Sequence, residues 1–231
     1  MAMSANTPGF MAIWKSIDDA DATDYLHWLT REHVFERVGV PGFRSGRVFR
    51  HTDPVPRRFF ILYDLDNAGV LTSAPYLERL NNPTPWSQRA MQMMRDFTRG
   101  GGQVTADAGG GAGGWVALMR FETDWPAALQ DQQGQSLAMA LADLDGVARV
   151  RVLESVQQAT ALSTREKTFR AGSDQTYQGV LLLEGLEPER TWAAAGTAVE
   201  HLLAAGCAHL PEVHRYHTVF SAHAGVVHTR A

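Results

Sequence analysis

The chain of 231 residues lacks most of the features that mark exported, membrane-spanning or nucleic-acid-binding proteins. Cys207 is the single cysteine, so no disulfide can form within the chain, which is typical of a reducing compartment. No apolar run approaches the roughly 18–20 residues that cross a bilayer. The N-terminus, Met1 to Pro8, lacks the basic start and apolar stretch of a signal peptide. A net charge of -4 also argues against a general nucleic-acid binder. We therefore expect a cytoplasmic protein whose partners include neither membrane nor nucleic acid.

Motifs for common cofactors are also missing. The sequence has no nucleophile elbow, Walker loop, C-x-x-C pair or H-E-x-x-H motif. Residues 109–114 formally fit G-x-G-x-x-G, but they precede a predicted strand, whereas the dinucleotide fingerprint needs a helix there. The 8 glycines between Gly100 and Gly114 instead predict a flexible linker. We expect no cofactor.

What the sequence does contain is an internal repeat. Three segments recur in the same order, at shifts of 105 and 104 residues and then with about 15 residues added. The matched segments are Phe10–Lys15 with Trp115–Arg120, Gly42–Val48 with Gly146–Val152, and Ile61–Asp64 with Leu181–Glu184. The repeat predicts two halves, residues 1–106 and residues 113–231, joined by the glycine-rich linker at about 100–114. The added residues fall in the polar stretch 155–175, where we expect a long excursion.

Each half has the pattern strand-helix-strand-strand-helix-strand. In the first half the apolar pattern predicts strands at 9–17, 43–52 and 58–65, and a helix between the first two. A second helix follows and is broken at residues 81–85; Thr84 as N-cap and Pro85 then restart it, with an apolar stripe up to Phe97. A short fourth strand at 103–106 remains open, whereas residues 213–222 clearly predict the last strand of the second half.

This β-α-β-β-α-β order is the ferredoxin-like arrangement, which leaves one face of its antiparallel sheet without helices. Two copies in one chain can cover each other, sheet against sheet. We therefore predict an α+β protein in which two tandem ferredoxin-like repeats pack their sheets together as an intramolecular α/β barrel. Strands that are apolar on both faces, such as Phe10–Trp14 and Gly179–Leu183, support this prediction.

The order of elements, a helix containing Glu32-His33 and ending at Pro41-Gly42-Phe43, and the strand that follows at once resemble the dimeric α/β-barrel superfamily. That superfamily includes EthD-like proteins, antibiotic-biosynthesis-type monooxygenases, muconolactone-isomerase-like enzymes, polyketide cyclases and stress-responsive barrel proteins. The segment Leu80–Trp86 further resembles bacterial members that fuse both halves in one chain. The resemblance implies a self-sufficient monomer with an internal pseudo-dimer, or a homodimer built on another surface. Because function varies widely within this fold, the resemblance alone does not indicate a particular reaction.

A comparison of the two halves points to a pocket in the first. Trp14, His33 and Tyr63 stand where the second half has Met119, Leu137 and Leu183. An imidazole titrates near neutral pH, so we predict His33 as a general base. Tyr63 would assist it, and Trp14 would stack on an aromatic substrate. The EthD-like branch has a comparable histidine before its Pro-Gly turn, and His33 matches it. The plainer alternative is that all three residues belong to the core.

Basic and histidine residues form two further candidate clusters. Arg47 belongs to a group around the second strand that could bind a carboxylate or phosphate through paired donors; the alternative is a solvated strand edge protected by charge. That group comprises Arg44, Arg47, Arg50, His51, Arg57 and Arg58. In the last strand, His214 and His217 point to opposite faces, which argues against a shared metal ion. We expect no metal site, and His217 alone is a candidate pocket residue.

Two functions remain open at this point. The first is a cofactor-independent enzyme of monooxygenase, isomerase or cyclase type acting on a small aromatic or oxygenated compound. The second is a non-catalytic ligand-binding or stress-response protein with the same barrel. Whether His33, Tyr63 and Trp14 face one cavity discriminates between them.

Overall fold

The computed structural model describes residues 7–156, 163–170 and 175–225. Its strands follow one another in the order β1-β3-β2-β8-β5-β7-β6-β4 and close into a barrel. The α+β class and the barrel predicted from the repeat are thus confirmed. The strands are β1 (Gly9–Ile17), β2 (Phe43–His51), β3 (Arg57–Leu65), β4 (Met94–Gly109), β5 (Trp115–Phe121), β6 (Val147–Ser155), β7 (Gly179–Gly185) and β8 (Val213–His223).

By its internal contacts the chain divides into two compact units. Unit 1 gathers the described residues within 1–102, 156–176 and 219–231, and unit 2 those within 103–155 and 177–218. The polar excursion after β6 therefore belongs to unit 1, although it lies inside the second repeat in the sequence. This reassignment matters because the excursion brings side chains to the candidate site.

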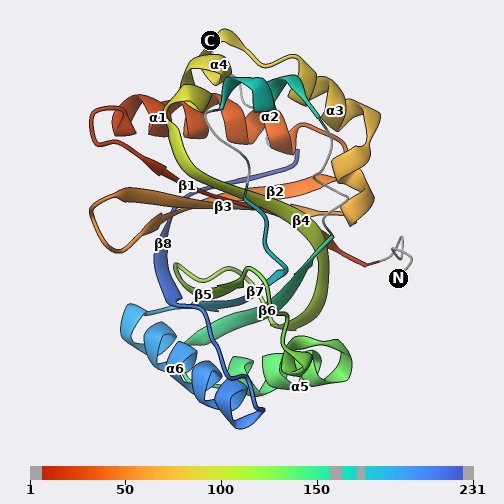
Figure 1. The fold of residues 1–231 in the computed structure, drawn as a ribbon, viewed down its shortest axis with the longest axis vertical. Helices are drawn as coiled ribbons and strands as arrows, with labels where there is room; N and C mark the ends of the chain where they lie inside the picture. Colours follow the sequence, from red (N-terminus) through yellow and green to blue (C-terminus); the bar gives the residue numbers. More distant parts are fainter. Residues whose placement is uncertain (1–6, 157–162, 171–174, 226–231) are drawn as a thin grey trace. The chain divides into compact units, whose positions relative to one another are not determined.

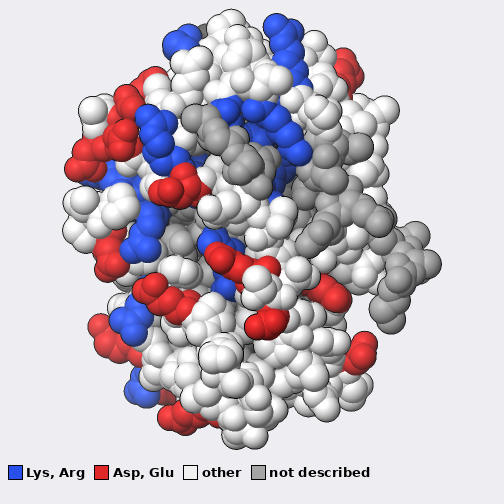
Figure 2. Space-filling view, viewed as in Figure 1, with Lys and Arg blue, Asp and Glu red and all other residues white. Residues whose placement is uncertain are grey.

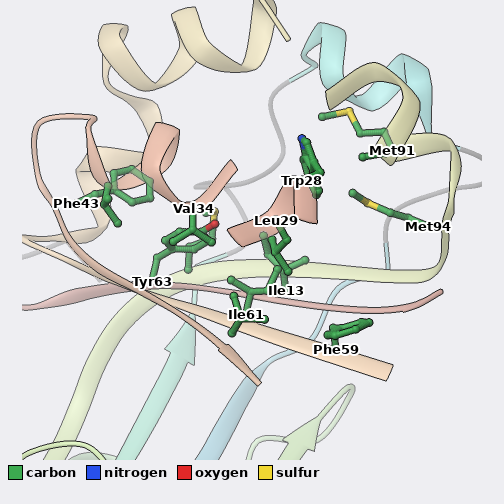
Figure 3. Packing of buried hydrophobic residues seen from close by; sticks show 14 of the residues in the cluster. Ile13, Trp28, Leu29, Val34, Phe43, Phe59, Ile61, Tyr63, Met91 and Met94 are labelled. Atoms are coloured by element: carbon green, nitrogen blue, oxygen red, sulfur yellow. The ribbon is translucent and has the colours of Figure 1, made fainter. Parts of the chain in front are cut away.

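Unit 1 has a sheet in which β3 pairs antiparallel with both β1 and β2. Its helices cover one face of that sheet (Figure 1). They are α1 (Ala22–Trp28), the π-helical turn η1 (Leu29–His33), α2 (Val34–Val38), the 3-10 turn η2 (Ala68–Thr72), α3 (Ala74–Asn81), α4 (Pro85–Gln92) and the 3-10 turn η5 (Arg165–Phe169). Ile13 and Ile61 are register partners on this face and form its core with Trp28 and Leu29 (Figure 3).

Unit 2 repeats the plan with β7 between β5 and β6. The 3-10 turn η3 (Ala127–Leu129), α5 (Asp131–Ala142) and α6 (Pro188–Ala204) pack on its sheet. Small and aliphatic side chains such as Ala138, Ala198 and Leu202 fill that core. None of the helices in the described ranges is long and apolar enough to span a membrane.

The predicted helix break at residues 81–85 is confirmed. α3 ends at Asn81, and α4 starts at Pro85 with the Thr84 hydroxyl accepting a hydrogen bond from the Ser87 backbone N–H at 2.9 Å. Such a side-chain cap satisfies a backbone donor that has no partner within the helix. The prediction that the apolar stripe continues helically to Phe97 is wrong, since α4 ends at Gln92 and β4 begins at Met94.

The prediction of a flexible linker from Gly100 is wrong for its first ten residues, which form most of β4. At Gly101 the absence of a side chain permits close packing. A Cβ atom added at Gly101 would lie 2.3 Å from Leu71 Cδ1 and 2.9 Å from the Phe10 carbonyl oxygen. Glycine inside a strand often marks such a close approach of backbone, and composition alone does not separate this cause from flexibility.

Candidate functional site

A small cavity lies between the sheet and the helices of unit 1. Its volume is about 20 Å³, enough for one ordered water molecule. Apolar and basic side chains share its lining, which comprises Met11, Ile13, Lys15, Trp28, His33, Arg37, Tyr76, Met91, Met94, Phe97, Arg99, Glu166 and Arg170. Figure 3 shows Trp28, Met91 and Met94 grouped near Ile13 at this place. A cavity this small with five basic residues in its lining indicates a site for polar or anionic groups.

Strand β1 delivers Lys15 to the cavity. Alternate residues of a strand point to opposite faces, so Lys15 shares the helix-covered face with Met11 and Ile13. Lys15 is only 3% exposed, and its Nζ lies 5.3 Å from the centre of the Tyr25 ring. Among the described residues, no carboxylate forms an ion pair with it. Burial without a counter-ion is costly for an ammonium group, so the uncharged amine is favoured.

The π-helical turn η1 delivers His33. The Thr30 hydroxyl donates to the Leu26 carbonyl oxygen at 2.7 Å, a back-bond that competes with regular helical hydrogen bonding. Single π turns within a helix occur frequently at functional sites. His33 is buried, its ring centre lies 4.3 Å from that of Trp28, and its Nδ1 has no hydrogen-bond partner in the described part of the chain.

A buried ion pair closes one side of the cavity. Arg37 of α2 donates through Nη2 to a carboxylate oxygen of Glu166, which η5 provides from the excursion. The second terminal nitrogen of Arg37, Nη1, lies 3.6 Å from Glu36 Oε2 but makes no hydrogen bond. Arg37 is thus paired, yet it retains a donor for a ligand.

A second guanidinium group, that of Arg99 on β4, has no carboxylate partner among the described residues. Its Nη2 donates to the Tyr76 hydroxyl at 2.6 Å, and that hydroxyl donates to Met11 Sδ at 3.1 Å. The Nε of Arg99 is buried without a hydrogen-bond partner. Buried donors without partners are rare in proteins and call for a ligand or a water molecule.

The arrangement lowers the pKa of both nitrogen bases in the cavity. Burial, followed by the nearby guanidinium groups of Arg170 and Arg37, lowers the pKa of Lys15 to about 7, and Glu166 offsets only part of this. Burial, followed by the cations Arg37, Lys15 and Arg99, holds the pKa of His33 well below its ordinary value. At neutral pH His33 is therefore uncharged, and Lys15 is close to its midpoint. Because a base works best with a pKa near the working pH, Lys15 is the stronger base candidate.

The residues predicted from the sequence do not all meet. His33 lines the cavity, and Tyr63 is buried on the same face of the sheet, next to Val34 and Phe43 and away from the cavity lining (Figure 3). Burial raises the pKa of Tyr63. The prediction that Trp14 shares this pocket is wrong, because Trp14 points to the other face of β1 and stacks on Phe60 at 4.8 Å. The catalytic roles of His33 and Tyr63 stay predictions.

The other predicted binding residues lie elsewhere. Arg47 is buried, with its guanidinium carbon 5.3 Å from the centre of the Phe49 ring, and it does not line the cavity. His217 lies in unit 2, with its ring centre 5.7 Å from that of Trp115. Several of the surrounding arginines bind local carboxylates, including Arg44 to Asp66 at 2.6 Å. Such exposed pairs fit the solvated-edge alternative.

Sequence reasoning missed Lys15, Arg37, Arg99 and Glu166. A lysine inside the otherwise apolar strand 9–17 was the one visible signal. The other three lie on α2, β4 and η5, far apart in the sequence. On the face shown in Figure 2, Lys and Arg atoms gather over the helical part of unit 1.

Comparisons with known proteins agree on the fold. No family model and no curated protein matches the sequence. Among solved structures, an anthrone oxidase-like protein matches with 14% identity and a TM-score of 0.62, over 96% of each chain. A candidate monooxygenase from Fusobacterium nucleatum matches with 6% identity and a TM-score of 0.61, over 94% of each chain. One from Lactobacillus acidophilus matches with 10% identity and a TM-score of 0.52, over 96% of this chain and 98% of its own. The chain therefore shares the ferredoxin-like α/β-barrel fold of these solved structures.

Proposed function

We propose that the unit 1 cavity is the active site of an enzyme that removes a proton from a small, acidic, oxygen-bearing molecule, with Lys15 as the base. One observation carries the proposal: two nitrogen bases, Lys15 and His33, line a single buried cavity beside guanidinium groups. The cations lower the basicity of the two nitrogens and would at the same time stabilise the negative charge of the deprotonated substrate. Oxygenation, isomerisation and cyclisation can all begin with this step.

Oxygenation comes first among these reactions because the solved structures with the higher similarity are an anthrone oxidase-like protein and a candidate monooxygenase. The step balances with dioxygen as the oxidant. Lys15 takes a proton from an activated CH₂ group, and the resulting carbanion gives its electrons to O₂. The carbon ends as a carbonyl, having lost two hydrogens and gained one oxygen atom, and the second oxygen atom leaves as water. His33, uncharged, would hold or pass the proton at its Nδ1.

The test begins with binding. Thermal shift of the purified chain against phenolic acids, quinones and lactones reports any ligand, because a ligand at 100 times its Kd adds about 2.7 kcal/mol of stability. Hits are then assayed for oxygen uptake in an electrode cell, and for exchange of substrate hydrogen with deuterated water.

Variants separate the roles of the residues. We expect Lys15→Met and Lys15→Arg to abolish oxygen uptake and hydrogen exchange alike, and Lys167→Arg, which lies outside the cavity lining, to leave both intact. A ligand that binds with neither uptake nor exchange would identify a non-catalytic binding protein and overturn the enzyme proposal. Turnover that survives in Lys15→Met would remove Lys15 from the role of base.

A further inference from the structure

The chain uses lysine very sparingly. It has 2 lysines, Lys15 and Lys167, against 19 arginines. One of the two is placed on the buried face of β1, inside a cavity that otherwise takes its charge from arginines. A guanidinium group cannot be deprotonated in a protein, whereas an amine can. The choice of lysine at position 15 therefore supplies a property that the arginines around it lack.

That property is nucleophilicity. Lysine attacks carbonyl carbon only as the uncharged amine, and desolvation beside other cations is a known way to keep it uncharged. Lys15 meets both conditions: it is buried, and Arg37 and Arg170 are close enough to disfavour its ammonium form. No described carboxylate forms an ion pair with its Nζ. The amine is thus available to a molecule in the cavity.

The same cavity offers donors for a carboxylate. Arg99 Nε and Arg37 Nη1 are buried without hydrogen-bond partners in the described residues. Guanidinium donors bind planar carboxylates well. An amine and unpaired guanidinium donors in one small cavity select a molecule that carries both a carbonyl and an acid group.

We propose that Lys15 forms an imine with a small keto or aldehydo acid whose carboxylate binds to Arg99 and Arg37. This inference rests on the proposed cavity but names its substrate class. Lys15 Nζ attacks the carbonyl carbon, the two amine hydrogens and the carbonyl oxygen leave as water, and a C=N bond forms; nothing is oxidised or reduced. Because the cavity volume is about 20 Å³, even a short acid fits only if lining side chains move.

The test traps the imine in the full native chain. The protein is incubated at neutral pH with pyruvate and sodium cyanoborohydride, which reduces an imine to a stable secondary amine, and peptides are mapped by mass spectrometry. The ratio of modification at Lys15 to that at Lys167 is then compared with the ratio obtained with acetone, which lacks the carboxylate. Because the ratio is internal to each sample, it cancels the different reactivity of the two ketones.

With pyruvate we expect at least about ten times more modification at Lys15 than at Lys167, since an ordinary lysine is almost wholly protonated at neutral pH. The ratio should fall in urea, where Lys15 loses its surroundings. Arg99→Met should lower the pyruvate ratio and leave the acetone ratio unchanged, and the latter also shows that the variant is folded. Trapping at Lys167 or at the N-terminal amine alone would overturn the inference, and equal ratios for pyruvate and acetone would overturn the acid as its substrate class.

The outcome also separates this inference from the proposed function. Trapping at Lys15 without oxygen uptake or hydrogen exchange on any substrate refutes base catalysis and leaves the imine standing. Turnover that depends on Lys15, together with no trapping, refutes the imine alone.

Discussion

Arg37 and Glu166 lie 129 residues apart in the sequence and form a buried ion pair in unit 1. The pair joins η5 to α2, and both of its residues line the candidate site. Its partners are almost fully buried, with side chains 1% and 7% exposed. A buried charge depends on its counter-ion, because water cannot reach the charge to solvate it if the counter-ion is lost.

Loss of Glu166 should therefore be costly. We expect Glu166→Ala to lower the free energy of unfolding by about 3–5 kcal/mol, as for other buried pairs broken on one side. Asp66→Ala is the matched control: it removes the partner of Arg44 in a pair whose side chains are 57% and 53% exposed, and should cost about 0–1 kcal/mol. Urea denaturation followed by circular dichroism measures both. Equal losses would show that the Arg37 pair is not buried as described.

Lys15 should make stability depend on pH in a defined window. Its pKa falls from 10.5 in the unfolded chain to about 7 in the folded one. Between these values the unfolded chain holds more protons, so the free energy of unfolding rises with pH. Below pH 7 both states carry the charge, and the penalty reaches roughly 5 kcal/mol. The groups around the amine are Tyr25, His33, Arg37, Arg99, Glu166 and Arg170.

Lys15→Met removes this contribution. We expect the variant to be more stable than the parent at pH 7 and the difference to shrink toward about pH 9, measured by urea denaturation across the range. The comparison is kept below pH 10 to avoid tyrosine ionisation. Burial raises the pKa of Tyr25, so above that pH its ionisation in the unfolded chain would oppose folding. Parallel pH profiles for parent and variant would contradict the lowered pKa of Lys15.

His33 should make the stability of the protein depend on pH at acidic values. Its pKa lies well below the ordinary 6.5, so the unfolded chain binds a proton that the folded chain refuses. The free energy of unfolding is then unaffected by His33 above pH 6.5 and declines as the pH falls below this value. We expect His33→Gln to flatten this decline. Nitrogen NMR of the imidazole rings provides the direct measurement, and His33 should keep the spectrum of a neutral ring while ordinary histidines become charged.

Gly46 should tolerate no side chain. A Cβ atom there would lie 2.8 Å from Tyr63 Cε1 and 2.8 Å from Val34 Cγ1, both within the packed core of unit 1. We expect Gly46→Ala to destabilise the protein by about 1–3 kcal/mol through overpacking. Gly114→Ala adds the same methyl group with nothing within 4 Å and should be close to neutral. Thermal melting of the two variants decides the matter, and similar melting temperatures would speak against the packing of α2 on β2.

Local signals were sufficient for much of the fold and for little of the site. Thr84 and Pro85 start a helix because a cap and a fixed φ act within one turn, and alternating apolar residues define a strand wherever it pairs. The glycines before residue 110 misled the prediction because they lie in a strand, where Gly101 packs closely against Leu71 and Phe10, which lie far away in the sequence. His33 was found because it stood out within its repeat.

The sequence by itself determined the order of elements and hence the α/β barrel, because periodicity and turn chemistry are local properties of the chain. Only the tertiary structure decided which basic side chains share a cavity. Lys15 and Arg99 come from β1 and β4, and Glu166 comes from an excursion of the second repeat that belongs to unit 1. Burial and charge proximity change the protonation of a side chain, and both depend on residues brought together by folding. The sequence therefore predicted a histidine as the base, whereas the tertiary structure favours a lysine.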